Sequence, residues 1–222
     1  MQAMLLAELR VAIVERTQRL RPDGLAVLTA GNISCRAGDL VAISPSAIDY
    51  DDYRPDLVTV VDIGGAIVEG EAGPSTELPM HLAAYRATGA AAVVHTHSPF
   101  ATALACSTLP ELPPIHYLVA SLGGAVRITP YAPPGSGELA RVMEEGLRDR
   151  LAVLLGNHGA VTIGQSLRQA YDRSLLLEWL CMVYARTLGL PGGGRPLDAG
   201  QLEEMVEAMG RYEQARGEPS SP

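Results

Sequence analysis

The predicted fold depends on the segment Val93–His97, with the sequence Val-Val-His-Thr-His. Its apolar start predicts the end of a buried strand that leads into two histidines. Residues two apart in an extended chain point to the same face, so the rings of His95 and His97 should share one space. Such a pair supplies two ligands for a metal ion. The competing interpretation is a pair of hydrogen-bonded core residues, the usual role of a single histidine beside apolar residues.

Helix and strand patterns extend from this segment in both directions. Several strand pairs are joined by tight turns, so we expect an α/β fold of three α/β/α layers, with a central mixed, largely antiparallel sheet. An N-terminal helix should place Leu6, Leu9, Ile13 and Leu20 on one stripe. Further helices are predicted over residues 75–89, 99–109, 136–147, 166–188 and 201–212. Strands are predicted over residues 41–46, 57–62, 66–68, 93–97, 115–119, 126–129, 151–155 and 160–163. The stretch 27–34 should begin like a strand at residues 27–30 and then form a Gly-Asn turn at Gly31 and Asn32.

The size and composition of the chain are those of an ordinary globular domain. Its 222 residues are 47% hydrophobic and 19% charged, which favours a single domain over residues 1–216 and a disordered tail over residues 217–222. The formal net charge of −8 argues against a nucleic-acid or membrane partner. Every basic residue is an arginine, which excludes chemistry through a lysine Schiff base.

The cysteines and the absence of long apolar runs predict a cellular compartment. Cys35, Cys106 and Cys181 are odd in number and far apart, which favours a reduced, cytoplasmic protein. No signal peptide and no run of about 20 apolar residues is visible.

His158 and Glu77 extend the histidine pair into a candidate metal site. His158 stands between glycines directly after the predicted strand 151–155, where a turn can approach a ligand closely. Three imidazoles with an open position are typical of a catalytic zinc site. Glu77, at a predicted helix start, could be a fourth ligand, a general base or a favourable partner of the helix dipole. His81 and His116 are expected to have supporting or structural roles.

A second group of residues suggests a pocket for a phosphate. It consists of Gly31 and Asn32, Ser46 with the Ala47 amide, and Ser75 with Thr76 at a predicted helix N-terminus. Each of these could also simply make a turn. No arginine lies inside these three stretches, so we expect neutral donors rather than a charge clamp.

Six short motifs together identify a family resemblance across about residues 5–188. In chain order they cover residues 29–34, 43–46, 74–77, 94–97, 115–117 and 157–159. With these motifs the chain resembles the class II aldolases of the fuculose-phosphate aldolase and ribulose-phosphate epimerase family. The resemblance implies a zinc-dependent lyase that cleaves a ketose 1-phosphate such as L-fuculose 1-phosphate to dihydroxyacetone phosphate and a short aldehyde.

The same resemblance implies roles for individual residues. Zn²⁺ would bind His95, His97, His158 and Glu77, with Glu77 also acting as acid/base. The substrate phosphate would bind Gly31, Asn32, Ser46, Ala47, Ser75 and Thr76. Tyr117 would donate a proton in the site of a neighbouring subunit of a homotetramer, and Tyr212 loosely resembles the family's C-terminal tyrosine.

Two positions depart from the family pattern. Ala47 stands where the family often has glycine, and the loop 133–135 lacks the aromatic residue that fuculose-phosphate aldolases have there. Other activities on this fold are a pentulose-phosphate 4-epimerase, a sugar-phosphate dehydratase and a non-catalytic domain like the adducin head. The epimerases usually have aspartate where this chain has Glu77, which favours the aldolase.

Overall fold

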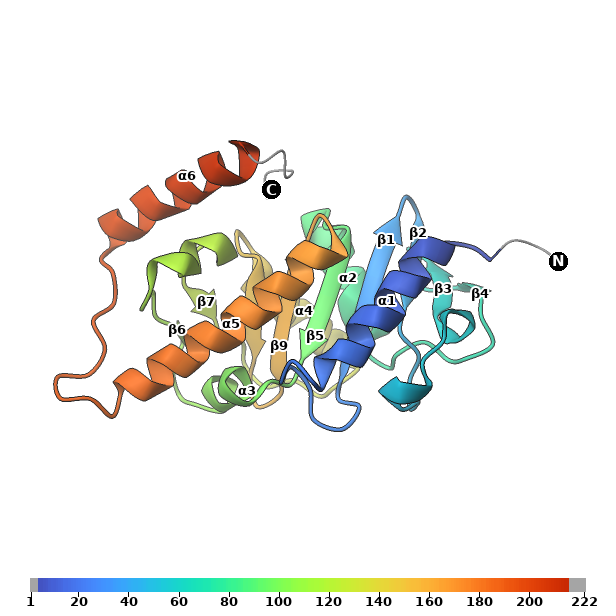
Figure 1. The fold of residues 1–222 in the computed structure, drawn as a ribbon, viewed down its shortest axis with the longest axis horizontal. Helices are drawn as coiled ribbons and strands as arrows, with labels where there is room; N and C mark the ends of the chain where they lie inside the picture. Colours follow the sequence, from blue (N-terminus) through green and yellow to red (C-terminus); the bar gives the residue numbers. More distant parts are fainter. Residues whose placement is uncertain (1–3, 216–222) are drawn as a thin grey trace.

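The computed structural model describes residues 4–215 and is built around one seven-stranded sheet (Figure 1). Each pair of neighbouring strands within it is antiparallel. Ile128 adds one parallel bridge to Leu154 at an edge, so the predicted mixed, largely antiparallel sheet is confirmed. The spatial order is β4 (Ile67–Glu69), β3 (Thr59–Asp62), β2 (Leu40–Ile43), β1 (Gly31–Ala37), β5 (Ala92–Thr96), β9 (Gly159–Gly164) and β8 (Ala152–Leu155).

Helices cover both faces of this sheet, which gives the three layers (Figure 1). The face toward the viewer carries α1 (Ala7–Leu20), α3 (Pro99–Ala105) and α5 (Leu167–Thr187), and the opposite face carries α2 (Leu78–Thr88) and α4 (Gly137–Leu147). Three elements lie beside the sheet: the ribbon of β6 (Glu111–Leu112) with β7 (Val126–Arg127), and the 3₁₀ helix η3 (Tyr117–Leu122), against which α6 (Ala199–Ala215) packs.

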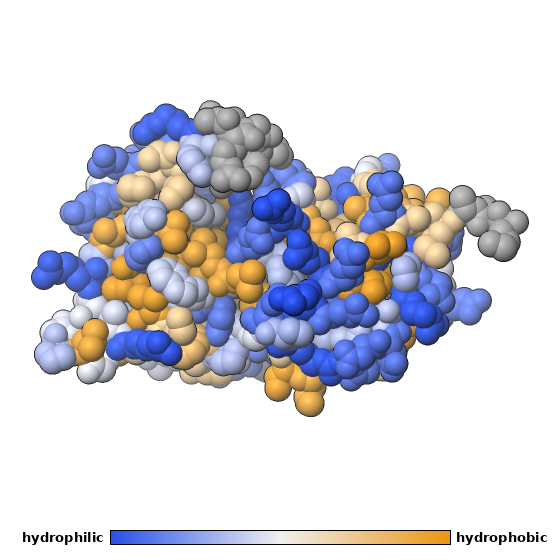
Figure 2. Space-filling view, viewed as in Figure 1, coloured by the Kyte–Doolittle hydropathy of each residue, from blue (hydrophilic) through white to orange (hydrophobic). Residues whose placement is uncertain are grey.

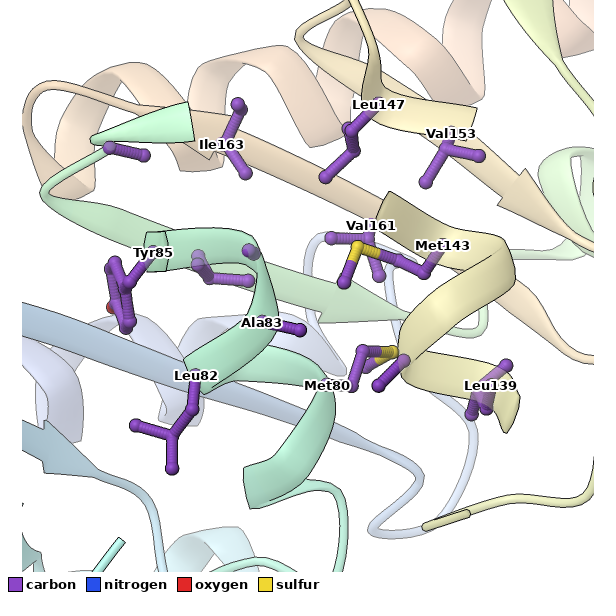
Figure 3. Packing of buried hydrophobic residues seen from close by; sticks show 14 of the residues in the cluster. Met80, Leu82, Ala83, Tyr85, Leu139, Met143, Leu147, Val153, Val161 and Ile163 are labelled. Atoms are coloured by element: carbon purple, nitrogen blue, oxygen red, sulfur yellow. The ribbon is translucent and has the colours of Figure 1, made fainter. Parts of the chain in front are cut away.

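Strand alternation sorts the side chains of β5 between the two layers. Ala92 and Val94 pack with α1 and α5, whereas Val93 packs with α2 and α4. Figure 3 shows the hydrophobic cluster between the sheet and the two helices α2 and α4, in which Met80 of α2 and Met143 of α4 lie against the sheet. The same period of two aims His95 toward the α2 side, because it lies two residues beyond Val93. β5 pairs with β1 on one side and β9 on the other, so the support for this histidine is central and stiff.

Helix ends follow the local chemistry of the sequence. The Ser166 hydroxyl caps α5 by accepting from the backbone amide of Gln169. In return, the side-chain oxygen of Gln169 accepts from the backbone amide of Gln165. The Ser136 hydroxyl caps α4 by accepting from the backbone amide of Leu139. α2 ends at Gly89, which adopts the left-handed conformation that favours glycine.

Two predicted strands are wrong in part or in whole. The chain before Gly31 is a turn, because the amides of Leu25 and Ala26 bond back to the Leu20 carbonyl, and Leu28 has a left-handed backbone. The predicted Gly-Asn turn is wrong too, because Gly31 and Asn32 begin β1 and pair with β5. The predicted strand 115–119 is replaced by the start of η3. Its His116 ring accepts from the Leu118 amide, and this local bond turns the backbone away from an extended path.

The remaining differences are small or concern the ends of the chain. α2 begins at Leu78 rather than near Ser75, and η2 (Pro55–Leu57) shortens the predicted strand 57–62. The predicted tail, residues 217–222, lies outside the described residues, and the single domain over 1–216 stays a prediction. Within residues 4–215, every helix is too short or too polar to cross a bilayer.

Hydrophobic side chains are not all enclosed by these layers. Figure 2 shows them gathered on the visible face where α5, α3 and η3 lie, whereas the part over α1 is more hydrophilic. On α5, Leu175 and Trp179 are both partly exposed. The ring of Trp179 packs edge-on against His116, with ring centroids 4.9 Å apart.

Candidate active site

Three imidazole rings converge at the end of β5. His95 and His97 come from this strand and the turn after it, and His158 comes from the β8–β9 turn. Each offers a ring nitrogen within 4.8 Å of the others, and the Nε2 atoms of His95 and His97 are 2.9 Å apart. The expected convergence of His158 on the histidine pair is therefore present.

The carboxylate of Glu77 closes this cluster from the N-terminal end of α2. Its Oε2 atom lies 3.0 Å from His95 Nε2, and its Oε1 atom lies 3.2 Å from His158 Nε2. Asn32 donates a hydrogen bond of 2.8 Å from its amide nitrogen to Oε2. Glu77 holds the N-cap position, but its side chain does not cap the helix. Its carboxylate points into the cluster instead.

The donor set fits a divalent cation. His95 Nδ1 lies 2.9 Å from the Ala160 carbonyl oxygen and must donate to it, so neutral His95 presents the lone pair of Nε2 to the cluster. Glu77 Oε1 and His158 Nδ1 are buried without a hydrogen-bond partner among the described residues. Lone pairs and a carboxylate crowded together repel one another unless a positive charge lies between them.

Burial and neighbouring groups shift the pKa values of Glu77 and His97. Burial acts to raise the pKa of Glu77, but the neighbouring imidazoles of His95 and His158 and the hydrogen bond from Asn32 lower it below the usual range. Burial and repulsion from His95 and His158 lower the pKa of His97 to about 3. At neutral pH the site therefore holds a carboxylate and a neutral His97, the states in which both groups bind metals.

Two glycines allow the strands to approach this closely. Gly31 has φ +148°, and a Cβ there would lie 3.1 Å from the His95 carbonyl oxygen. A Cβ on Gly159 would collide with the Thr96 carbonyl oxygen. Both positions set the distance between β5 and the strands that flank it, so a larger residue would push the histidines apart.

A cavity of about 290 Å³ opens beside the cluster, and the predicted phosphate residues meet in it. Backbone bonds hold its walls together, because the Ser46 amide donates to Gly73 and the Ser75 amide donates to Ser44. Tyr53 adds a hydrogen bond to the Pro45 carbonyl oxygen. The lining includes Gly31, Asn32, Ser46, Ala47, Ser75, Thr76, Glu77, His97 and His158.

The cavity offers hydroxyl and amide groups from Asn32, Ser46, Ser75 and Thr76. No arginine is among its described lining residues, as expected from the sequence. The N-terminus of α2 points its partial positive charge toward Ser75 and Thr76. Ala47 adopts φ +58°, a conformation that costs an alanine more than a glycine, which explains why glycine suits this position.

The two tyrosines named from the sequence lie outside this cavity in the single chain. Tyr117 begins η3 with 47% of its surface exposed and stacks on His116, with ring centroids 4.6 Å apart. It is not among the described residues that line the cavity. Tyr212 lies on α6 and is exposed.

Sequence reasoning missed Ser34 and Tyr85 as supporting residues, whereas it expected such a role for His81. Ser34 and Tyr85 are buried and hydrogen-bonded to each other behind the site, and His81 joins them as a buried support. Burial, repulsion from His95 and attraction to Glu77 together set the pKa of His81 to about 3, with burial the largest cause. The signal was present as spacing, since 77, 81 and 85 share one helix face.

The cavity also has lining residues outside the predicted phosphate and metal groups. Pro134 lies in the loop 133–135 that lacks the family's aromatic residue, and it borders the cavity. A Cβ on Gly135 would lie 3.0 Å from the Thr76 carbonyl oxygen, so this loop packs against the phosphate stretch. Ile48 and Tyr53 complete the apolar part of the lining.

Comparison with known proteins gives consistent results. Residues 11–185 match the family model of the class II aldolase and adducin N-terminal domain. A 5-deoxy-D-ribulose 1-phosphate aldolase of Bacillus thuringiensis serovar kurstaki is 38% identical, covering 95% of this chain and 100% of that protein. A 5-methylthioribulose-1-phosphate/5-deoxyribulose-1-phosphate aldolase of Rhodospirillum rubrum is 36% identical, covering 96% of each chain. A solved L-fuculose 1-phosphate aldolase superposes with a TM-score of 0.83 at 34% identity, covering 93% of this chain and 98% of that one.

We expect the histidine cluster to determine metal binding. After chelation, reloading with Zn²⁺ and removal of excess ion, the chain should retain about one ion, and His97→Ala should lose most of it. His116→Ala is the matched control, because this histidine lies outside the cluster and should leave the content unchanged. Elemental analysis gives the readout, and full metal content in His97→Ala would contradict the expectation.

Proposed function

Because this chain belongs to the class II aldolase and adducin N-terminal domain family and is an aldolase, we propose that it reversibly cleaves a ketose 1-phosphate. The products are dihydroxyacetone phosphate and a short aldehyde. The supporting observation is the cavity that joins a metal-binding cluster to a hydroxyl-lined anion pocket. The relatives are named for fuculose, 5-deoxyribulose and 5-methylthioribulose 1-phosphates, all of them ketose 1-phosphates, and the sugar proposed here is of the L-fuculose 1-phosphate type.

The cation is proposed to be Zn²⁺, held by His95, His97, His158 and Glu77. Three imidazoles and a carboxylate suit zinc, although the same donors accept other first-row divalent ions. When bound, the ion supplies Lewis-acid stabilisation of the negative charge that develops on the substrate carbonyl oxygen. The chain has no lysine to form an imine, so none of its own groups can supply that electron sink.

Proton transfers fall to the side chains around the cavity. In the cleavage direction the C4 hydroxyl loses its proton, the C3–C4 bond breaks, and its electron pair moves into the enediolate of dihydroxyacetone phosphate. Glu77 lies at the cavity wall and would take a proton from water and pass it to C3 of the enediolate. Tyr117 would accept the proton of the C4 hydroxyl.

The phosphate is proposed to bind between Ser46, Ser75 and Thr76, with Asn32 and the backbone of Gly31 and Ala47 completing the pocket. Hydroxyls and amides at a helix N-terminus bind a phosphate through hydrogen bonds without a cationic side chain. The loop 133–135 would shape the aldehyde end, and Pro134 would offer it an apolar surface.

The assembly is proposed to be a cytoplasmic homotetramer with active sites between subunits. Tyr117 does not line the cavity of its own chain, so a neighbouring copy would have to supply it. The three cysteines are free, which suits a reducing compartment.

Epimerase and dehydratase activities use the same fold but would leave different products. An epimerase recombines the cleaved fragments and releases an isomeric pentulose phosphate, and a dehydratase releases water. The glutamate at position 77 favours the aldolase over the epimerase. The full-length similarity to aldolases leaves no support for a non-catalytic interaction domain.

Product analysis tests this function. The zinc-loaded protein should release dihydroxyacetone phosphate from L-fuculose 1-phosphate or 5-deoxyribulose 1-phosphate, measured by its reduction in a coupled NADH assay. The chelated protein is the control and should be inactive. Cleavage of neither sugar, or conversion of a pentulose phosphate to its isomer without release of a triose, would contradict the proposal.

Deuterium exchange separates the two proton carriers. When the enzyme is incubated in D₂O with dihydroxyacetone phosphate and no aldehyde, it should replace one proton of the hydroxymethyl carbon, which is C3 of the ketose, by deuterium. NMR measures the rate of this exchange. Glu77→Gln should slow this exchange by roughly 10²- to 10⁴-fold, the usual contribution of general acid–base catalysis.

Tyr117→Phe provides the matched comparison. It should slow cleavage of the ketose while leaving the exchange of dihydroxyacetone phosphate intact, because only cleavage involves the aldehyde oxygen. Glu138→Gln, an exposed glutamate on α4, controls for loss of charge. Unimpaired exchange in metal-loaded Glu77→Gln would remove Glu77 from this role.

A further inference from the structure

A chain of buried hydrogen bonds runs from the interior to the Glu77 carboxylate. Tyr85 Oη lies 2.6 Å from Ser34 Oγ, which lies 2.6 Å from His81 Nδ1. His81 Nε2 lies 2.5 Å from Asn32 Oδ1, and Asn32 Nδ2 lies 2.8 Å from Glu77 Oε2. All five residues are buried, and His81 is completely enclosed.

The partners fix the direction of every bond in this chain. An ionised carboxylate only accepts, so the Asn32 amide must turn its NH₂ group to Glu77 and its oxygen to His81. That oxygen also only accepts, so His81 must carry its single proton on Nε2. Its Nδ1 then accepts from the Ser34 hydroxyl, whose oxygen accepts from Tyr85. Four donors satisfy four acceptors, and all point toward Glu77.

The chain joins one face of a helix to one face of a strand. Glu77, His81 and Tyr85 are spaced by four along α2, whereas Asn32 and Ser34 are spaced by two along β1. His81 does not line the substrate cavity, so it touches neither the sugar nor its phosphate. The hydrogen bond from His81 to the site is the one to Asn32.

We propose that His81 is a positioning residue that fixes the orientation of the Asn32 amide and thereby holds the Glu77 carboxylate in the active site. The inference rests on the proposed role of Glu77 as a metal ligand. Without the Nε2–H donor, the Asn32 amide can rotate and present its oxygen to Glu77. Two facing oxygens repel, which displaces the carboxylate from the cluster. Such outer partners typically change metal affinity by about 10- to 100-fold.

A double-mutant cycle with Zn²⁺ as the probe tests this role. His81→Leu should weaken Zn²⁺ binding by about 10- to 100-fold in a chelator competition. In the Asn32→Ala background the same substitution should cost less than about twofold, because the intermediary is gone. His81→Gln keeps an N–H donor near the position of Nε2 and should restore most of the affinity. A merely structural role would give equal losses in both backgrounds and no rescue by glutamine.

A second substitution covers the case in which His81→Leu fails to fold. Ser34→Ala removes the donor that fixes the His81 tautomer and should weaken Zn²⁺ binding by roughly 2- to 10-fold. Ser174→Ala is the matched control, since this buried hydroxyl bonds to the Thr162 hydroxyl away from the site and should leave affinity unchanged. Equal affinities for Ser34→Ala and Ser174→Ala would overturn the inference.

These readouts need no substrate, which separates the inference from the proposed function. If the unsubstituted chain binds Zn²⁺ but His81→Leu and Ser34→Ala bind it equally well, the inference alone fails. If the unsubstituted chain does not bind Zn²⁺, the proposed function fails and the inference fails with it.

Discussion

The site depends on mutual repulsion among lone pairs and a carboxylate at the end of one central strand. The Nε2 atoms of His95 and His97 are 2.9 Å apart, and Glu77 lies 3.0 Å from the first of them. Such an arrangement is costly in a buried place unless a cation compensates it. β5 can carry it because pairing on both sides stiffens the strand and the Ala160 carbonyl fixes the His95 ring.

One helix terminus connects the two halves of the site. The chain at Ser75–Glu77 leads into α2 and places hydroxyls on the proposed phosphate pocket and a carboxylate on the histidine cluster. The Ser75 hydroxyl accepts from the Glu77 amide, which shapes this entry before the helix begins at Leu78. A phosphate bound at the helix start and a sugar carbonyl near the histidines would then be held in one orientation. Positioning of this kind is a large part of what an enzyme contributes.

Sequence patterns with a short period predicted the local parts of this arrangement. The alternation along 93–97 placed His95 and His97 together, and the predicted helix starts at residues 136 and 166 coincide with the caps of α4 and α5. The pairing of β5 with β9, which delivers His158, joins residues far apart in the sequence, such as His95 and Val161, and has no local signature. Convergence of the motifs therefore came from the family resemblance. The predicted strands at 27–30 and 115–119 failed because β-branched and aromatic composition was outweighed by backbone bonds to Leu20 and by the His116 ring. His81 and Tyr85 meet Ser34 because α2 packs on β1. Residue spacing within one element does not predict this contact, because it depends on the order of the strands in the sheet.

The most direct test of the central claim is the position of the ion itself. Crystals of the zinc-loaded protein, measured on both sides of the zinc absorption edge, should show one anomalous peak per chain. The account predicts that the peak lies at about 2.0–2.1 Å from a ring nitrogen of each of His95, His97 and His158. A peak at any other place, or rings that point away from a common centre, would contradict it.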